Sequence, residues 1–80
     1  MHPVIVVVVQ TRGPHRQSEA LRAALGLTLR GAHVEVIVDQ PLATSLAARA
    51  AETLRSFGHA VGAGDLAAAL DRADRVEVWT

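Results

Sequence analysis

Residues 4–9 read Val-Ile-Val-Val-Val-Val, an uninterrupted run of β-branched residues near the beginning of the chain. Successive side chains of a strand point to opposite faces of its sheet, so a run without polar alternation predicts a strand covered on both faces. Such strands are typical of parallel sheets whose faces are packed against helices. The run therefore predicts the central strand of a parallel α/β sheet.

Three later stretches have the spacing of amphipathic helices. The first is predicted to begin at Ser18 and to end before Gly31, and the second to begin at Thr44 or Ser45 and to stop at Gly58. The third is predicted to follow an Asp65 cap. The second helix should bury one apolar face, which consists of Leu46, Ala47, Ala50, Leu54 and Phe57.

Three further strands are expected between and after these helices. Residues 34–38 predict the second strand, residues 59–61 a brief third strand, and residues 75–80 a fourth strand at a sheet edge. The order is βαβαβαβ, and short links between the elements favour parallel strands joined by right-handed crossovers. We therefore expect residues 1–80 to form a single three-layer α/β domain with a mostly parallel four-stranded sheet.

The composition excludes several kinds of chemistry. The chain has no cysteine, which removes disulfides, thiolate metal sites, cysteine nucleophiles and any persulfide carried by this chain. It also has no lysine, and its formal net charge is zero, so we expect no nucleic-acid partner. The longest apolar run is too short to span a bilayer and lacks the features of a signal peptide. We therefore expect a cytoplasmic protein without a membrane partner.

Four stretches carry a family resemblance. TRGPH (residues 11–15) follows the Val-rich strand, and EALRAAL (residues 19–25) and LRGAHVEV (residues 29–36) come next. LAAALDRADRVEVW (residues 66–79) closes the chain. These stretches resemble the DsrE/DsrF-like family of sulfur-relay proteins, whose fold is flavodoxin-like.

The resemblance implies an assembly role. Members of the family typically form trimers or hexamers, and those that transfer sulfur carry a persulfide on a cysteine in a loop after a middle strand. This chain is shorter than usual between Asp39 and Gly58 and has no cysteine, so no position inherits that catalytic role. The family also includes subunits without the cysteine that complete a hetero-oligomer.

The loop after the first strand is the main candidate for ligand binding. Ligands of open parallel sheets bind outside the carboxyl ends of the strands, where we expect residues 10–16, 39–42, 62–65 and 79–80 to converge. A helix start together with two arginines suits an anion such as phosphate or a carboxylate. The candidate residues are Thr11, Arg12, Gly13, His15 and Arg16. Alternatively, Gly13 and Pro14 simply make the turn, and the arginines are solvated or contact another subunit.

No catalytic, cofactor or metal site is predicted. Ser18, His15 and Asp39 suggest a hydrolytic arrangement, but Ser18 is better explained as a helix cap and no Gly-x-Ser-x-Gly elbow surrounds it. The four histidines fall at opposite ends of the expected strands, which leaves no metal-ligand spacing. Gly62 to Asp65 is interpreted as a plain turn from strand to helix.

Association with other chains has broader support than any ligand site. A core of this size is small, and the alanine-rich second helix, at Ala47 and Ala51, would permit close approach of another helix. Trp79, on the expected edge strand, is either an interface anchor or a cap over the sheet edge. We expect a homo-oligomer (dimer, trimer or hexamer) or a hetero-oligomer with a related subunit.

Two functional hypotheses follow. The first is a non-catalytic, oligomeric DsrE-like binding or scaffold subunit that adjoins a sulfur-transfer partner. The second is a small-molecule protein or enzyme that binds an anion or a nucleotide through the loop after the first strand.

Overall fold

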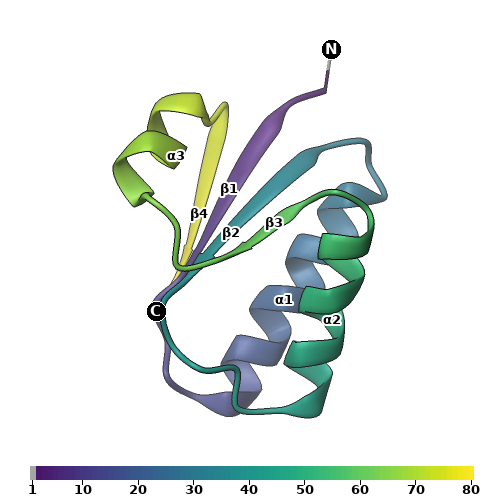
Figure 1. Ribbon diagram of the computed structural model, residues 1–80, viewed down its shortest axis with the longest axis vertical. Coiled ribbons are helices and arrows are strands. Elements are labelled where there is room, and N and C mark those ends of the chain that lie inside the picture. The colour runs from purple at the N-terminus through teal and green to yellow at the C-terminus, as the bar shows by residue number, and fades with distance from the viewer. Residues whose placement is uncertain (1) are drawn as a thin grey trace.

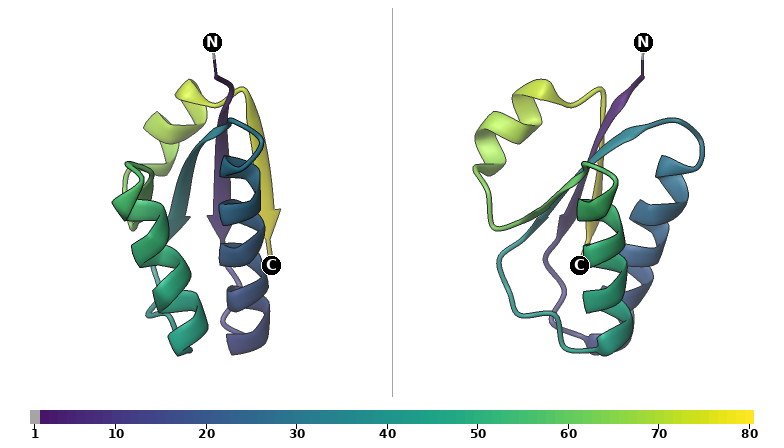
Figure 2. Two further views of the ribbon diagram at one scale, coloured as in Figure 1. Left: turned by 90° about the vertical axis from the view of Figure 1, so that its right-hand side faces the viewer. Right: turned by 45° about the vertical axis from the view of Figure 1, so that its right-hand side comes forward.

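The computed structural model describes residues 2–80, which form seven elements in the expected βαβαβαβ order (Figure 1). All four strands are parallel, and the helices lie on both faces of the sheet (Figure 2). The prediction of a single three-layer α/β domain is confirmed. The elements are β1 (Val4–Val9), α1 (Pro14–Thr28), β2 (His33–Val38), α2 (Ser45–Ser56), β3 (Ala60–Gly62), α3 (Leu66–Arg72) and β4 (Arg75–Trp79).

The sheet has the strand order β3-β2-β1-β4, so the Val-rich β1 is an interior strand as predicted. The chain builds outward from β1 to β2 and β3, and then crosses back to place β4 on the other side of β1. This reversal occurs between β1 and β4, and in doubly wound sheets it marks the crevice in which ligands bind. β4 and β3 are the two edge strands.

The larger core lies between the sheet and the helices α1 and α2, which cover the same face (Figures 1 and 2). Strand residues Val7 and Val34 are fully buried there, as are Leu21 of α1 and Leu54 of α2. Burial of a valine or leucine side chain contributes about 1.5–3 kcal/mol. This core therefore accounts for most of the apolar burial in the domain.

Among the described residues, α3 is the helix that covers the opposite face, and it has seven residues (Figure 1). Its core is correspondingly small and consists of Val6, Val8 and Ala69, with Ile37 and Ala73 partly buried against it. Asp65 caps α3 as predicted, because its carboxylate accepts the Ala68 N–H at 3.2 Å. One short helix over four strands leaves part of this face uncovered.

The first helix begins four residues earlier than the sequence suggested. Its N-cap is Gly13 and its first residue is Pro14, whose missing N–H and fixed φ suit the first helical position. Ser18 is consequently a buried residue within the helix, and the prediction that it caps the helix is wrong. Its hydroxyl donates to the Pro14 carbonyl oxygen at 3.1 Å instead.

Two residues assigned to the apolar face of α2 are in fact exposed. Ala47, Ala50, Ala51 and Leu54 form the buried stripe, and Leu46, one position before it, is 64% exposed. Phe57 follows the last helical residue and is 72% exposed, because the chain turns there into Gly58 with a φ of 87°. Three alanines and Leu54 thus form the core contacts of α2, and Leu46 and the adjoining Phe57 are left outside.

Candidate functional site

The loops at the carboxyl ends of the strands meet at the crevice between β1 and β4. The carbonyl oxygen of Trp79 accepts the N–H groups of Gln10 and Thr11 at 2.8 and 3.1 Å. The Gln40 side chain donates to the Gln10 carbonyl oxygen at 3.2 Å, which adds the loop after β2. The predicted convergence of the loops after β1, β2 and β4 is confirmed, and the chain's own backbone fills part of the crevice. Ala63 and Gly64, after β3, line a hollow together with Gln10 and Asp39, so the fourth predicted segment also lies at this edge.

Arg16 is engaged with the end of β4. Its Nε donates to the Thr80 carbonyl oxygen at 2.8 Å, and its guanidinium carbon lies 4.9 Å from the centre of the Trp79 ring. Trp79 is half-buried and packs against the larger core. Arg16 therefore holds β4 against α1, and the guanidinium offers fewer free donors to an external anion.

The other residues of the predicted anion site are only partly suited to that role. The Thr11 hydroxyl accepts the Gly13 N–H at 3.1 Å, so both groups are used in a local turn. His15 is exposed, and its Nε2 lies 3.0 Å from the Glu19 carboxylate, which brings negative charge to the helix start. Arg12 is exposed on the same loop. The five residues are neighbours, but their contacts favour a structural turn over an anion cradle.

Gln17 is the residue of this region that sequence reasoning missed. It is fully buried, and its amide donates to the carbonyl oxygens of Thr11 at 3.4 Å and Pro41 at 3.3 Å. Its own oxygen accepts the Ala43 N–H at 3.1 Å. A helix that begins at Pro14 places Gln17, Leu21 and Ala24 on one buried stripe. A helix that begins at Ser18 leaves Gln17 outside, so its place on this stripe is not predicted.

Ser18, the serine near this site, has no basic partner among residues 2–80. The Ser18 hydroxyl lies 2.6 Å from the Thr44 hydroxyl, which itself caps α2 by accepting the Ala47 N–H at 3.0 Å. The imidazole of His15 contacts the Glu19 carboxylate instead. The geometry of Ser18 is that of a link between the starts of α1 and α2.

The predicted interface residues of α2 lie inside the chain. Ala47 and Ala51 are both fully buried, and α2 packs against α1. The close helix approach that these alanines permit therefore occurs between two helices of the same chain, and the two residues offer no surface to another chain. Trp79 remains half-exposed beside the β4 edge.

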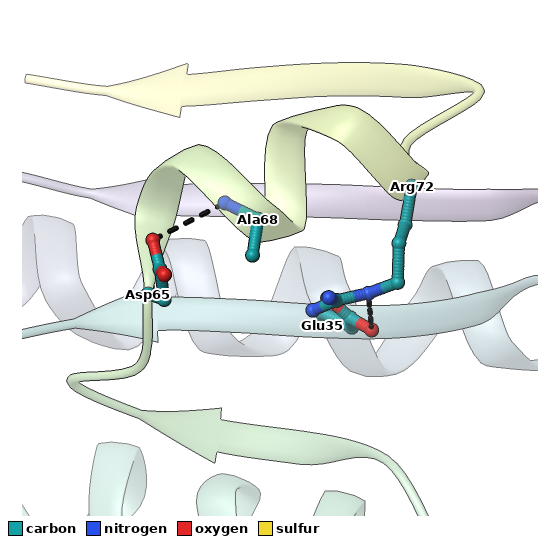
Figure 3. A network of polar contacts seen from close by, with 4 residues as sticks. All are labelled: Glu35, Asp65, Ala68 and Arg72. Carbon is teal, nitrogen blue, oxygen red and sulfur yellow. Dashed lines mark hydrogen bonds and ion pairs between the residues drawn. The ribbon is translucent and has the colours of Figure 1, made fainter.

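An ion pair crosses the face covered by α3. Arg72, in the last turn of α3, donates from Nε and Nη2 to the two oxygens of Glu35 in β2, at 3.2 and 2.9 Å (Figure 3). The hydrogen bond and the charge of Glu35 raise the pKa of Arg72. Next to this pair is a hollow of about 260 Å³, lined among others by Ile37, Gly62 and Asp65.

Apart from Leu46 at the start of α2, the large exposed apolar side chains among residues 2–80 lie in two regions. On the α3 side, Leu66 and Leu70 of the helix and Val76 and Val78 of β4 are 37–56% exposed. At the far ends of α1 and α2, Leu29 and Phe57 are exposed around a hollow of about 290 Å³ that Leu25 and His59 also line. Exposed apolar groups of this kind are typical of surfaces that bind other proteins.

The structure shows no clustering of metal-binding groups. Within residues 2–80, no group of three or more His, Cys, Asp or Glu side chains is placed to hold a metal ion. His33 and His59 lie with ring centres 5.3 Å apart at the amino ends of β2 and β3. No helix in this part of the chain has both the length and the apolar character needed to cross a membrane.

No protein-family model matches this chain, and neither a curated protein nor a solved structure matches it significantly. The resemblance to DsrE/DsrF-like proteins thus rests on the four stretches of sequence described above.

Proposed function

We propose that the chain is a non-catalytic binding subunit that acts by assembling with other chains. The observation that supports this most is the set of large apolar side chains left outside a domain whose polar groups at the strand ends are engaged with one another. Among residues 2–80, buried side-chain nitrogen and oxygen atoms all have partners, so no buried polar group is aimed at an absent ligand. Such a surface suits protein binding better than chemistry on a small molecule.

The proposal includes a DsrE-like role beside a sulfur-transfer partner. The chain has no cysteine and cannot form a persulfide, so the partner must supply the thiol in any sulfur relay. The βαβαβαβ order and the parallel sheet are compatible with that relationship, although a fold does not by itself supply a function. A cytoplasmic location belongs to the same proposal, and fractionation of host cells checks it.

Purification under native conditions from the host tests the function. The chain should elute as a complex with itself or with a related subunit, and light scattering should give the number of chains. A stable monomer without any partner at cellular concentration contradicts the assembly role. Identification of a cysteine-containing subunit in the complex, with persulfide on that cysteine, would support the link to sulfur transfer.

The alternative proposal, an anion or nucleotide site at the loop after β1, has weaker support. Arg12 and the start of α1 favour it, whereas the contacts of Arg16 with Thr80 and of His15 with Glu19 act against it. A ligand that binds only the folded chain raises its melting temperature. Thermal melts with inorganic phosphate and with ADP therefore separate the two proposals.

A further inference from the structure

The two edge strands of the sheet, β3 and β4, differ in how well they are protected from pairing with a strand of another chain. β3 has three residues, and the carbonyl oxygen of Val61 accepts Nε and Nη2 of Arg55 at 3.3 and 3.0 Å. β4 has five residues, and Val76 and Val78 expose apolar side chains beside its outer edge. Short strands and covering side chains are the usual means of protecting an edge from pairing with another chain. The β3 edge has this protection, and the β4 edge has less of it.

The backbone N–H and C=O groups of β4 point alternately toward β1 and away from it. The Trp79 carbonyl oxygen accepts N–H groups from Gln10 and Thr11 and so faces β1. Backbone groups alternate in direction along a strand, which turns the N–H and C=O groups of Val76 and Val78 away from β1. These groups form a row of donors and acceptors that another strand can bind.

Successive side chains of β4 lie on opposite faces of the sheet. Glu77 and Trp79 lie opposite Val7 and Val9 of the larger core, so the odd-numbered side chains share the face of α1 and α2. Val76 and Val78 lie opposite Val6 and Val8, on the α3 face. One face of the edge thus carries a positive and a negative side chain two positions apart, Arg75 and Glu77, which pair within the chain.

We propose that a second copy of this chain docks on β4, with the two β4 strands antiparallel and Val76 opposite Val76 of the second copy. This register sets Arg75 opposite Glu77 of the second copy, and the two-fold axis repeats the pair. Val76 then exchanges backbone hydrogen bonds with Val76 of the second copy. The Val78 N–H faces the Asp74 carbonyl oxygen of the second copy, because the Asp74 N–H is already donated to the Val4 carbonyl oxygen of its own chain. The charged residues occupy the neighbouring pairs, in which side chains are closest. The result is one sheet with four strands from each copy.

The charges select this register over the next one. A shift that centres the axis on Glu77 sets Glu77 opposite Glu77 of the second copy, and like charges directly opposite each other are unfavourable. In a two-fold interface the same strand contacts its own copy, so its charged residues must be complementary to those of an identical antiparallel strand. This inference rests on the proposed assembly function and names its partner as the chain itself.

Two charge reversals test the pairing directly. Arg75→Glu makes both positions negative, and Glu77→Arg makes both positive, so each variant repels its own copy and attracts the other variant. Each variant alone should dimerise at least about tenfold more weakly than the wild type, and an equimolar mixture should recover a heterodimer. Sedimentation equilibrium measures the dissociation constants. Arg49→Glu and Glu52→Arg, on the exposed part of α2, are the matched controls and should leave the dimer unchanged.

The outcomes separate this inference from the function on which it rests. A wild-type monomer that is recovered from its host with a different subunit overturns β4 self-pairing and leaves the assembly role intact. A dimer that neither reversal weakens also overturns it, because the contact then lies elsewhere. Circular dichroism of each variant shows that it is folded, as expected for exposed side chains. Loss of both homodimers with recovery in the mixture supports the pairing.

Discussion

The guanidinium of Arg72 and the carboxylate of Glu35 join the last turn of α3 to an interior strand through two hydrogen bonds. The Glu35 side chain is only 13% exposed, so the pair is more sheltered on the strand side than at the helix. α3 otherwise buries little more than Ala69. The ion pair therefore adds to the small apolar contact that holds this helix over the sheet.

Replacement of Arg72 by alanine should loosen α3 without unfolding the rest of the domain. The remaining Glu35 carboxylate loses its counter-charge and both hydrogen bonds, and the helix keeps only its small apolar contact. Hydrogen exchange at the α3 amides should accelerate, while the amides of β1 stay protected. Arg22→Ala, at an exposed position of α1, is the control. Unchanged protection of α3 in Arg72→Ala would show that other contacts hold it.

Gln17→Leu should destabilise the fold by about 1–3 kcal/mol, which is the cost of leaving buried polar groups without partners. The leucine has a similar size but cannot accept the Ala43 N–H or donate to the Thr11 and Pro41 carbonyl oxygens. The denaturant midpoint of unfolding should fall with an unchanged slope. Gln10→Leu, at an exposed position, should change stability by less than about 0.5 kcal/mol. Equal stability of the two variants would contradict the structural role of Gln17.

His59 should make the fold less stable in mild acid. Burial, and then the charge of His33, lower the pKa of His59 in the folded chain. Its Nδ1 also accepts the Val34 N–H at 3.1 Å, which requires that nitrogen to be unprotonated. The unfolded chain binds this proton more readily, so the stability contributed by neutral His59 is complete above pH ~6.5 and is lost as the pH falls toward the lower folded pKa.

Denaturant unfolding at several pH values measures this contribution. His59→Asn keeps a hydrogen-bond acceptor near the position of Nδ1 and cannot titrate, so its stability should vary less with pH across this range. An identical pH dependence in the wild type and in His59→Asn would assign the effect to other groups.

Arg16→Ala should change the environment of Trp79, the single tryptophan of the chain. The substitution removes the guanidinium from the indole face and the hydrogen bond to the Thr80 carbonyl oxygen. Tryptophan fluorescence should shift toward the emission of a more exposed indole, and Arg12→Ala should leave it unchanged. Phosphate should not raise the melting temperature of the wild type. A rise that Arg12→Ala abolishes would instead favour the anion-site proposal.

The fold was largely predictable because its signals are local. A few residues specify each element: the β-branched run specifies β1 as a strand, Asp65 marks the start of α3, and Gly58 marks the end of α2. The start of α1 was missed because Gly13 and Pro14 suit a loop turn as well as a helix start, and Ser18 suits a cap.

The candidate sites were less predictable because they depend on packing between distant segments. Nothing near Arg16 in the sequence indicates its contact with Thr80, and nothing near Ala47 or Ala51 indicates that α1 rather than another chain covers them. The sequence pattern assigns Leu46 and Phe57 to the core because they are large and apolar, but the buried stripe of α2 packs against the sheet and α1 through its alanines and Leu54. Which apolar residues stay outside is decided by tertiary packing.

Amide hydrogen exchange at Val76 and Val78 tests most directly the central claim that the chain works by assembly through its β4 edge. In a single copy these outward amides face solvent and exchange rapidly. The proposed pairing predicts that they are protected at high protein concentration, and that dilution or Glu77→Arg removes the protection. Rapid exchange of both amides at every concentration, in a folded wild-type protein, would contradict the claim.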